Sequence, residues 1–335
     1  MLPDVAIILL NWNGWEDTVE CLESLFQIDY PSFRVIVVDN NSQDESLNKI
    51  RSYCNGNLEV ESKFFQYTSS NKPIDIFEFN EEKLDYPEFL NSSVEFIKKI
   101  KNSPSHRSLI LIKNRTNYGF AKGNNIGIKF ALDVLEVPYT LLLNNDTVVD
   151  KEFLRELIRV AESDDKIALV GSKIYYYDYY GKDNEIWCAG GKIDLKKYPG
   201  HYGVIENIDL DTYKGSTLEC DWVSGAAMLI KSGKIPITYL NENFFFGCED
   251  ADLALRLQER GYTMKTAVNA KVWHKIGLSR RKKNTLKRTF TEIKTSLKFI
   301  KTHNKYYILY LPLYLVQIIK MYSFTFFKFL FKRSD

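Results

Sequence analysis

The sequence has few of the residues that build disulfide frameworks or zinc sites. Its five cysteines are odd in number, and no two of them have the short spacing of a zinc-binding pair. This excludes a small disulfide-stapled protein and is typical of reduced thiols in a cytosolic compartment. No basic region precedes the apolar run 5–10, so we interpret that run as a strand and not as a signal peptide. No G-x-G-x-x-G follows it, which argues against a dehydrogenase.

Charge is unevenly distributed along the chain. Residues 280–305 contain ten Lys or Arg and one acidic residue, a local charge of +9, which leaves −7 for the rest of a chain whose net charge is +2. A mildly acidic body with a basic segment indicates an anionic partner surface, either a membrane or a nucleic acid. Residues 306–331 are then mostly aliphatic and aromatic, with Lys320 and Lys328 as the only charges.

Strand and helix patterns alternate in the first half of the chain. Short apolar runs predict strands over 5–10, 34–39, 108–113 and 139–144, and helical spacing predicts helices over 17–27, 44–53, 124–135 and 153–161. This order predicts an α/β fold with a mostly parallel central sheet and helices on both faces.

Two regions depart from that alternation. Residues 54–107 are polar, aromatic and lysine-rich, and we interpret them as an insertion at the sheet edge with a helix near 88–101. From residue 166 the pattern becomes strand-rich and then predicts a helix over 251–260, which Gly261 ends. We therefore expect one main domain over 1–279 and a separate segment over 280–335.

The residues after each predicted strand are the first candidates for a binding site, because ligands of such sheets lie at the carboxyl ends of the strands. One of these clusters is Asn144, Asn145 and Asp146. A hard cation such as Mg²⁺ or Mn²⁺ prefers oxygen ligands and leaves positions open for substrate phosphates. Asn and Asp are also favoured in turns, so a metal site and a simple turn both remain open for this cluster.

Three carboxylates, Glu249, Asp250 and Asp252, stand at the start of a predicted helix. Acidic residues are stabilised by the helix dipole there, so capping is one interpretation. The apolar residues 244–246 before them indicate a partly buried wall, where a raised carboxylate pKa would suit a general base. His274, one of four histidines, follows a short apolar run and is either structural or functional.

In order and in context these segments resemble the inverting family 2 glycosyltransferases with the GT-A fold, in particular the rhamnosyltransferase-like branch. The resemblance covers residue 5 to about residue 279, apart from 54–107. It is carried by five ordered blocks, VAIILLNWNG, VIVVDNNSQDES, NYGFAKGNNIG, YTLLLNNDTVVD and FFFGCEDADLALRLQERGYTM followed by VWHKIGLS. It implies transfer of a sugar from a nucleotide-diphosphate donor, dTDP-rhamnose or a UDP-sugar, to a hydroxyl of a glycan or lipid-linked acceptor.

The resemblance also assigns roles to individual residues. Asp146 and His274 would hold the divalent cation, Mn²⁺ or Mg²⁺, and Asp250 would be the catalytic base. Asn144 stands where the family often has Asp, which lowers the negative charge at the metal. Donor contacts are implied for Asn11, Asn13, Asp39, Asn117, Gly119, Asn144 and Asn145. Acceptor contacts are expected of Trp222, Gly225, Glu249 and Asp252. A place in the core is the alternative for Trp222, and a role in the helix cap is the alternative for Glu249 and Asp252.

The basic and apolar C-terminal segment resembles a device that holds an enzyme on an anionic cytoplasmic leaflet. Residues 306–331 are long enough to span a bilayer, but Pro312, Gln317 and Lys320 favour a pair of interfacial helices. Packing on the enzyme's own core is the alternative. We expect a peripheral protein on the inner face of the cell membrane.

Two further function classes remain as rivals. A non-catalytic nucleotide-sugar-binding protein of the same fold is disfavoured because Asp146, Asp250 and His274 are all present. A nucleic-acid binder is disfavoured because the basic segment continues into a long apolar run, which fits lipid better than bases.

Overall fold

Five segments of the first half form parallel strands. The computed structural model describes residues 2–84, 94–203, 215–245, 247–276 and 285–331. The strands are β1 (Val5–Asn11), β2 (Phe33–Asp39), β3 (Asp75–Asn80), β4 (Ser108–Lys113) and β5 (Tyr139–Asn144). They lie in the order β5-β1-β2-β4-β3, each parallel to its neighbour.

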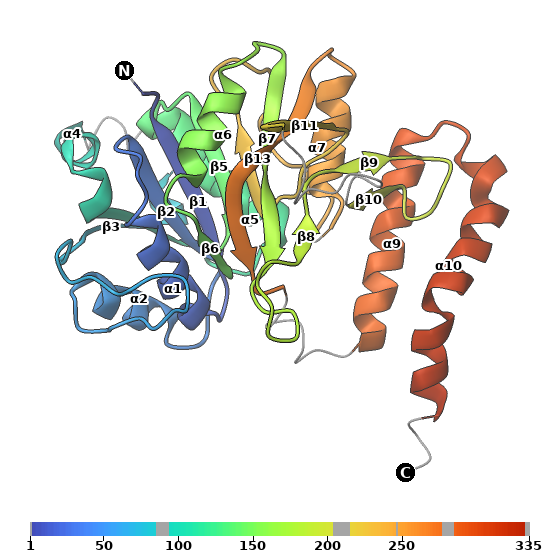
Figure 1. The fold of residues 1–335 in the computed structure, drawn as a ribbon, viewed down its shortest axis with the longest axis horizontal. Coiled ribbons are helices and arrows are strands. Elements are labelled where there is room, and N and C mark those ends of the chain that lie inside the picture. Colours follow the sequence, from blue (N-terminus) through green and yellow to red (C-terminus); the bar gives the residue numbers. More distant parts are fainter. Residues whose placement is uncertain (1, 85–93, 204–214, 246, 277–284, 332–335) are drawn as a thin grey trace.

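The second half extends the same sheet with mixed pairing. Its strands are β6 (Thr147–Val149), β7 (Ile167–Tyr176), β8 (Ile186–Cys188), β11 (Thr217–Cys220), β12 (Ala227–Ile230) and β13 (Thr263–His274). The order β11-β13-β7-β12 continues from β5, while β6 pairs with β13 and β8 with β7. β9 (Gly191–Ile193) and β10 (His201–Gly203) form a separate antiparallel ribbon. The expected mostly parallel central sheet is thus present, and the antiparallel pairs of the second half make it mixed (Figure 1).

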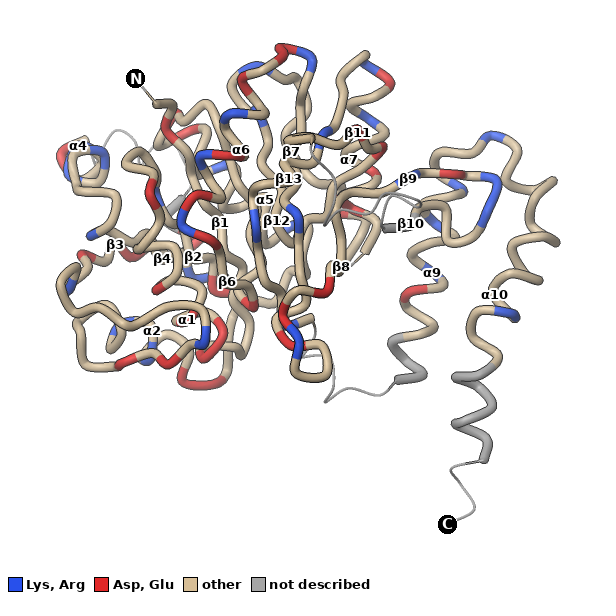
Figure 2. Tube along the Cα trace, viewed as in Figure 1, with Lys and Arg blue, Asp and Glu red and all other residues tan. Residues whose placement is uncertain are grey.

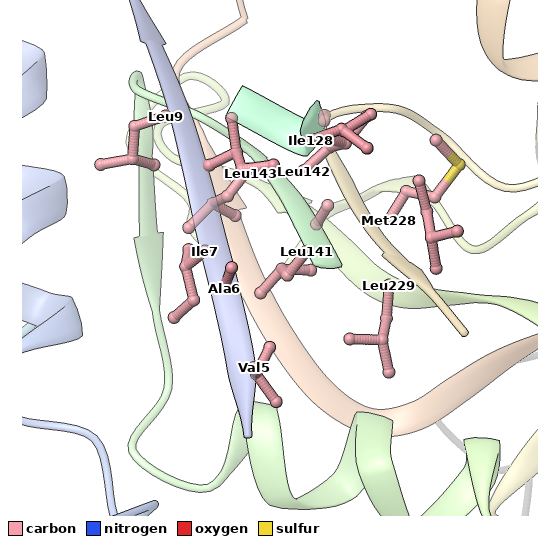
Figure 3. Close-up of a cluster of buried hydrophobic side chains, with 14 of the residues drawn as sticks. Val5, Ala6, Ile7, Leu9, Ile128, Leu141, Leu142, Leu143, Met228 and Leu229 are labelled. Carbon is pink, nitrogen blue, oxygen red and sulfur yellow. The ribbon is translucent and has the colours of Figure 1, made fainter. Parts of the chain in front are cut away.

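Both faces of the sheet are covered. The helices are α1 (Trp15–Leu25), α2 (Ser46–Cys54), α4 (Val94–Asn102), α5 (Gly119–Phe130), α6 (Phe153–Ala161) and α7 (Glu249–Gln258). Val5, Ile7 and Leu9 are fully buried, and so are the residues between them. Because consecutive strand residues point to opposite faces, this shows that β1 is buried on both. Figure 3 shows Ile128 of α5 beside Leu142 and Leu143 in this core.

Strand register brings the expected site residues to one edge. Asn11 pairs with Asp39 across β1 and β2, and Leu10 pairs with Asn144 across β1 and β5. The polar ends of three strands therefore lie side by side. The helix predicted over 124–135 begins earlier, at Gly119, and continues into a π-helical turn over Ala131–Leu135. Glu249 and Asp250 likewise belong to the first turn of α7.

The segment 54–107 contributes an edge strand that its composition did not predict. In β3, Phe77 and Phe79 are buried while Asp75 and Asn80 are exposed, so the strand packs one face on the core. Of the predicted helix 88–101, residues 88–93 lie outside the described residues, and α4 starts at Val94. A buried ion pair, Lys72 Nζ to Glu23 Oε2 at 3.0 Å, joins the segment to α1.

The C-terminal segment forms a helical hairpin of α9 (Thr285–His303) and α10 (Tyr307–Phe331). It lies beside the body, with α10 on its outer side (Figure 1). Phe299 of α9 and Tyr314 of α10 are fully buried in the main core cluster. Within the described part of the chain, no helix combines the length and hydropathy needed to cross a bilayer. Residues 277–284, with the first four basic residues of the segment, lie outside the described residues.

Candidate active site

A buried polar network joins the ends of β1, β2 and β5. Asn11 Nδ2 donates to Asp39 Oδ1 at 2.7 Å and to Ser42 Oγ at 3.1 Å. Thr18 Oγ1 donates to Asn11 Oδ1 at 2.8 Å and accepts from Asn145 Nδ2 at 2.9 Å. Asp39 also accepts from the backbone N–H of Ser42 at 3.0 Å. Three expected donor-site residues, Asn11, Asp39 and Asn145, therefore hold one another in a fixed arrangement.

A second group of amides surrounds the N-terminus of α5. Asn40 Nδ2 donates to Asn117 Oδ1 at 2.9 Å and to Gly119 O at 3.2 Å. Asn117 Oδ1 also accepts from Gly119 N at 2.9 Å. Asn13 lies nearer the surface with φ of 51°, a left-handed conformation that Asn tolerates. Its Oδ1 accepts from the backbone N–H of Gln43 at 2.7 Å, which ties the loop after β1 to the loop after β2.

Asp146 and His274 meet although 128 positions separate them. His274 ends β13 and pairs with Thr147 of β6, which directs its ring toward the turn at 144–146. Its Nε2 lies 2.9 Å from Asp146 Oδ1 and 3.3 Å from Asn144 Nδ2. His274 is 3% exposed, and its Nδ1 is buried without a hydrogen-bond partner.

This pair fits a divalent cation. An oxygen and a nitrogen donor 2.9 Å apart can share one cation at about 2.0–2.2 Å from each. The part of the chain that the structure describes holds no group of three or more His, Cys, Asp or Glu placed to bind a metal. Donor phosphates and water would supply further ligands, as is usual for Mg²⁺ sites.

A second charged cluster lies next to Asp146 and His274. Lys275 Nζ is 2.6 Å from both Asp17 Oδ1 and Glu20 Oε2, and its backbone N–H donates to Asp146 O at 2.9 Å. Burial lowers the pKa of Lys275, but Asp17 and Glu20 outweigh burial and raise the pKa above its ordinary value. Burial also raises the pKa of Asp17. This cluster fixes the backbone on which Asp146 and His274 stand.

Asp250 is held by two backbone donors. Its Oδ2 accepts from Gly225 N at 3.0 Å, and its Oδ1 accepts from Ala251 N at 2.8 Å. The side chain is half-buried. Each carboxylate oxygen keeps a lone pair for another donor, so the group is oriented and still able to take a proton. Gly225 acts here through its backbone.

The loop before α7 packs on the start of α5. Phe120 N donates to Phe245 O at 2.9 Å. A Cβ at Gly119 would lie 2.6 Å from the Phe245 ring, and Gly119 has φ of 78°. Glycine is therefore required here by the approach of Phe245, whereas the family resemblance implied a donor contact at Gly119.

The other expected acceptor residues are buried. Asp252 is 1% exposed, accepts from His303 Nε2 at 2.9 Å and lies 2.7 Å from Arg256 Nε. Burial alone would raise the pKa of Asp252, but the His303 hydrogen bond and the Arg256 charge lower it. Glu249 and Trp222 are 6% and 7% exposed. In this structure Asp252 faces the C-terminal hairpin, where it links α7 to α9.

Several residues of the site were not found by sequence reasoning. Ser42 stands three residues after Asp39, and its short polar side chain in a strand-end loop was a usable signal. Lys275 and His303 carried none, because their partners Asp17 and Asp252 are 258 and 51 positions away.

A relative of known name is similar to most of this chain. "Low-salt glycan biosynthesis hexosyltransferase Agl10" of Haloferax volcanii is 28% identical over 259 residues, covering 76% of this chain and 62% of that protein. The chain thus spans less than two thirds of that relative.

Two solved structures have a similar fold. Mannosyltransferase PcManGT from Pyrobaculum calidifontis, in complex with GDP-Man and Mn²⁺, has a TM-score of 0.53 at 13% identity, covering 89% of this chain and 63% of that one. GalNAc-T7 with UDP, GalNAc and Mn²⁺ has a TM-score of 0.51 at 13% identity, covering 82% and 44%. The expected GT-A fold is confirmed.

The family model "Glycosyl transferase family 2" matches residues 6–69 and 91–209, more than half of the chain. The matched residues include β2, β4, β5 and all of β1 except Val5, and the ends of β1, β2 and β5 form the network around Asn11 and Asp39. The match ends before Asp250 and His274, and the rhamnosyltransferase-like branch stays a prediction. On this match the chain belongs to glycosyl transferase family 2.

Proposed function

We propose that the protein transfers a sugar from a nucleotide-diphosphate donor to a hydroxyl of a glycan or lipid-linked acceptor. The observation that carries the proposal is the meeting of Asp146 and His274 at 2.9 Å, at the carboxyl edge of the parallel strands. A hexosyltransferase of glycan biosynthesis among the relatives supports it. The donor we favour is dTDP-rhamnose, with a UDP-sugar as the alternative.

Asp250 is the proposed catalytic base. It takes the proton of the acceptor hydroxyl while that oxygen forms a bond to the anomeric carbon of the donor. The bond between the anomeric carbon and the diphosphate oxygen breaks, and its electron pair leaves with the nucleoside diphosphate. Because attack comes from the face opposite the leaving group, one displacement inverts the anomeric configuration. The N–H groups of Gly225 and Ala251 hold the carboxylate in one orientation.

Asp146 and His274 are the proposed ligands of Mn²⁺ or Mg²⁺. Both similar structures contain Mn²⁺, which supports this assignment. When bound, such a cation neutralises charge on the leaving diphosphate. Asn144 and Asn145 add no charge, so we expect the cation to bind weakly until the donor supplies its phosphates.

The proposed place of action is the inner face of the cell membrane, with the protein bound peripherally. The charge of +9 over residues 280–305 and the apolar sequence after it support this placement.

A donor screen tests the proposal directly. Purified protein is incubated with Mn²⁺ and a panel of nucleotide-diphosphate sugars, and nucleoside diphosphate release is measured with and without an acceptor fraction. Release from one donor that rises with acceptor and disappears with EDTA is the expected result. Tight binding of a nucleotide sugar with no release under any condition would instead support a non-catalytic binding protein.

A further inference from the structure

The outer side of α10 is an exposed apolar surface. Its residues are Ile308, Leu309, Pro312, Leu313, Leu315, Val316, Ile319, Lys320 and Met321, which we call the outer face. Ile308 is 80% exposed, Leu309 77% and Ile319 67%. The intervening positions, such as Tyr314 and Ile318, are buried against α9 and the body. The helix is therefore apolar on both sides, and the residues that the structure describes cover only one of them.

Such a surface is unusual on a protein exposed only to water. Seven of its nine residues are large and aliphatic or Met, they follow each other at helical spacing, and Lys320 is the sole charge. Contiguous apolar patches of this kind mark contacts with a partner or a membrane. Figure 2 shows how sparse charge is along α10 compared with the body.

The charges around the outer face favour a lipid bilayer over a second copy of this chain as its partner. The sequence has no Asp or Glu between residues 293 and 334, whereas Lys301 and Lys305 are exposed close to the start of α10. Cations beside an apolar helix face match an anionic leaflet, in which acyl chains take up the apolar side chains and headgroups pair with lysines. In a symmetric pair of chains the same lysines would repel each other.

The hairpin is tied to the acceptor side of the enzyme. Asn304 Nδ2 and Tyr314 Oη both donate to Leu195 O, at 2.8 Å and 2.6 Å. His303 donates to Asp252, two residues after Asp250 on α7. Lys298 Nζ donates at 2.8 Å to Asn243 O, in the loop before α7. A surface bound by α10 would therefore be held in a set position relative to α7.

We infer that the outer face of α10 binds an anionic lipid bilayer and that the acceptor is a saccharide linked to a lipid of that bilayer. The second half of this inference rests on the proposed glycosyl transfer by Asp250. A lipid-linked acceptor stays at the membrane surface. An enzyme whose acceptor side is bound to the same surface can reach this acceptor without leaving the membrane.

Vesicle flotation tests the lipid surface. The full chain is mixed with phosphatidylcholine vesicles with or without phosphatidylglycerol. Leu309→Asp with Ile319→Asp should weaken binding to the anionic vesicles by about tenfold or more, because two apolar anchors are lost and two anions added. The matched control is Val94→Asp with Tyr180→Asp, which changes exposed apolar residues of the body and should bind as the parent does.

Charge and self-association complete the test of the surface. Lys305→Gln should weaken binding about fivefold, and only to anionic vesicles. Equal binding by the outer-face variant and the parent would overturn the inference. So would a parent protein that is dimeric in light scattering while the outer-face variant is monomeric, because the face would then join two chains.

The acceptor class is tested separately. Donor turnover is compared with two fractions of the source cells, the solvent-extracted lipids in vesicles and the water-soluble glycans. Stimulation mainly by the lipid fraction, lost in the outer-face variant, is expected. Stimulation by soluble glycans that equals or exceeds it overturns the acceptor assignment while leaving glycosyl transfer intact. Absence of nucleotide-sugar binding with Mn²⁺ would instead reject the proposed function, whatever the vesicle result.

Discussion

The proposed donor half and the proposed acceptor half of the candidate site are built in different ways. On the donor half, Asn11 and Asp39 are opposite each other in a parallel strand pair, so backbone register alone places them in hydrogen-bond contact. On the acceptor half, Asp250 depends on Gly225, on the loop before α7 and, through Asp252, on His303 of the C-terminal hairpin. The donor half follows from the sheet, whereas the acceptor half follows from packing of later elements. Changes to the tail should therefore alter acceptor use and spare the donor.

The largest expected effect is that of a substitution at Asp250, which should change sugar transfer and leave donor binding intact. Asp250→Asn should reduce sugar transfer by about 10²–10⁴-fold or more, because the amide keeps the shape but cannot take a proton. Donor affinity, measured by calorimetry with Mn²⁺, should be nearly unchanged. Glu249→Gln and Asp252→Asn are the controls, with changes mainly in acceptor KM. If either of them abolishes transfer while Asp250→Asn retains it, the base is a different carboxylate.

The next effect lies on the donor half. Asp146→Asn should weaken nucleoside-diphosphate binding about 10- to 100-fold in the presence of Mn²⁺, because one of two protein ligands loses its charge. His274→Gln should act in the same direction. In EDTA the variants and the parent should bind alike. A loss of affinity that persists without the cation would show that Asp146 acts on the fold or on the nucleotide itself.

Removal of α10 tests whether the tail belongs to the acceptor half alone. Deletion from Tyr306 onward exposes the surface that Tyr314 and Ile318 cover, and burial of each contributes about 1.5–3 kcal/mol. We expect a lower free energy of unfolding, loss of vesicle binding and weaker transfer, with nucleotide affinity within about twofold of the parent. Failure to fold, or a donor affinity that falls with transfer, would show that the hairpin supports the whole body.

Single substitutions at His303 test the contact between the C-terminal hairpin and α7 without removing α10. His303→Ala removes the hydrogen bond to Asp252 and should raise acceptor KM about 3- to 10-fold while donor affinity is unchanged. His303→Asn can still donate and should restore part of the effect. Equal acceptor kinetics in both variants and the parent would mean that the tail holds α7 by apolar packing alone.

The smallest effect is on acid stability. The pKa of Asp252 is lowered in the folded protein, so folding stabilises its charged form. That contribution is present above the unfolded value of about 3.9 and is lost as pH falls toward the folded pKa. Denaturant unfolding of Asp252→Asn should therefore show a shallower loss of stability below about pH 4 than the parent does. If the free energy of unfolding falls equally with pH in the variant and the parent, other carboxylates are responsible for the acid sensitivity.

The sequence predicts the apolar strands of the sheet but not its edge strand β3. The strands around 5–10, 34–39, 108–113 and 139–144 were predicted to within a residue or two, because each is a short apolar run bounded by polar turns. β3 was missed, since a strand with one exposed face and acidic residues has no such run. The unmatched gap of the family model, 70–90, includes β3 and is narrower than the insertion we assigned to 54–107.

Part of the candidate site follows from the predicted strands, and part of it depends on packing. The strand-end clusters at Asn11, Asp39 and Asn144 were expected together because parallel strands end at one edge. Asp146 and His274 were paired only through family resemblance, and the antiparallel register of β6 and β13 is what joins them. Trp222 and Asp252 are residue types suited to sugars, yet their burial is a property of packing that composition does not carry.

The sequence by itself determined the parallel half of the sheet, the polar ends of its strands and the basic-to-apolar change in the tail, because these follow from local periodicity and composition. Only the tertiary structure decided that Asp252 faces His303, that Lys275 is enclosed by Asp17 and Glu20, and which side of α10 is left uncovered. Those contacts join residues distant in the chain, and their free energy depends on burial and distance, which exist only once the chain has packed.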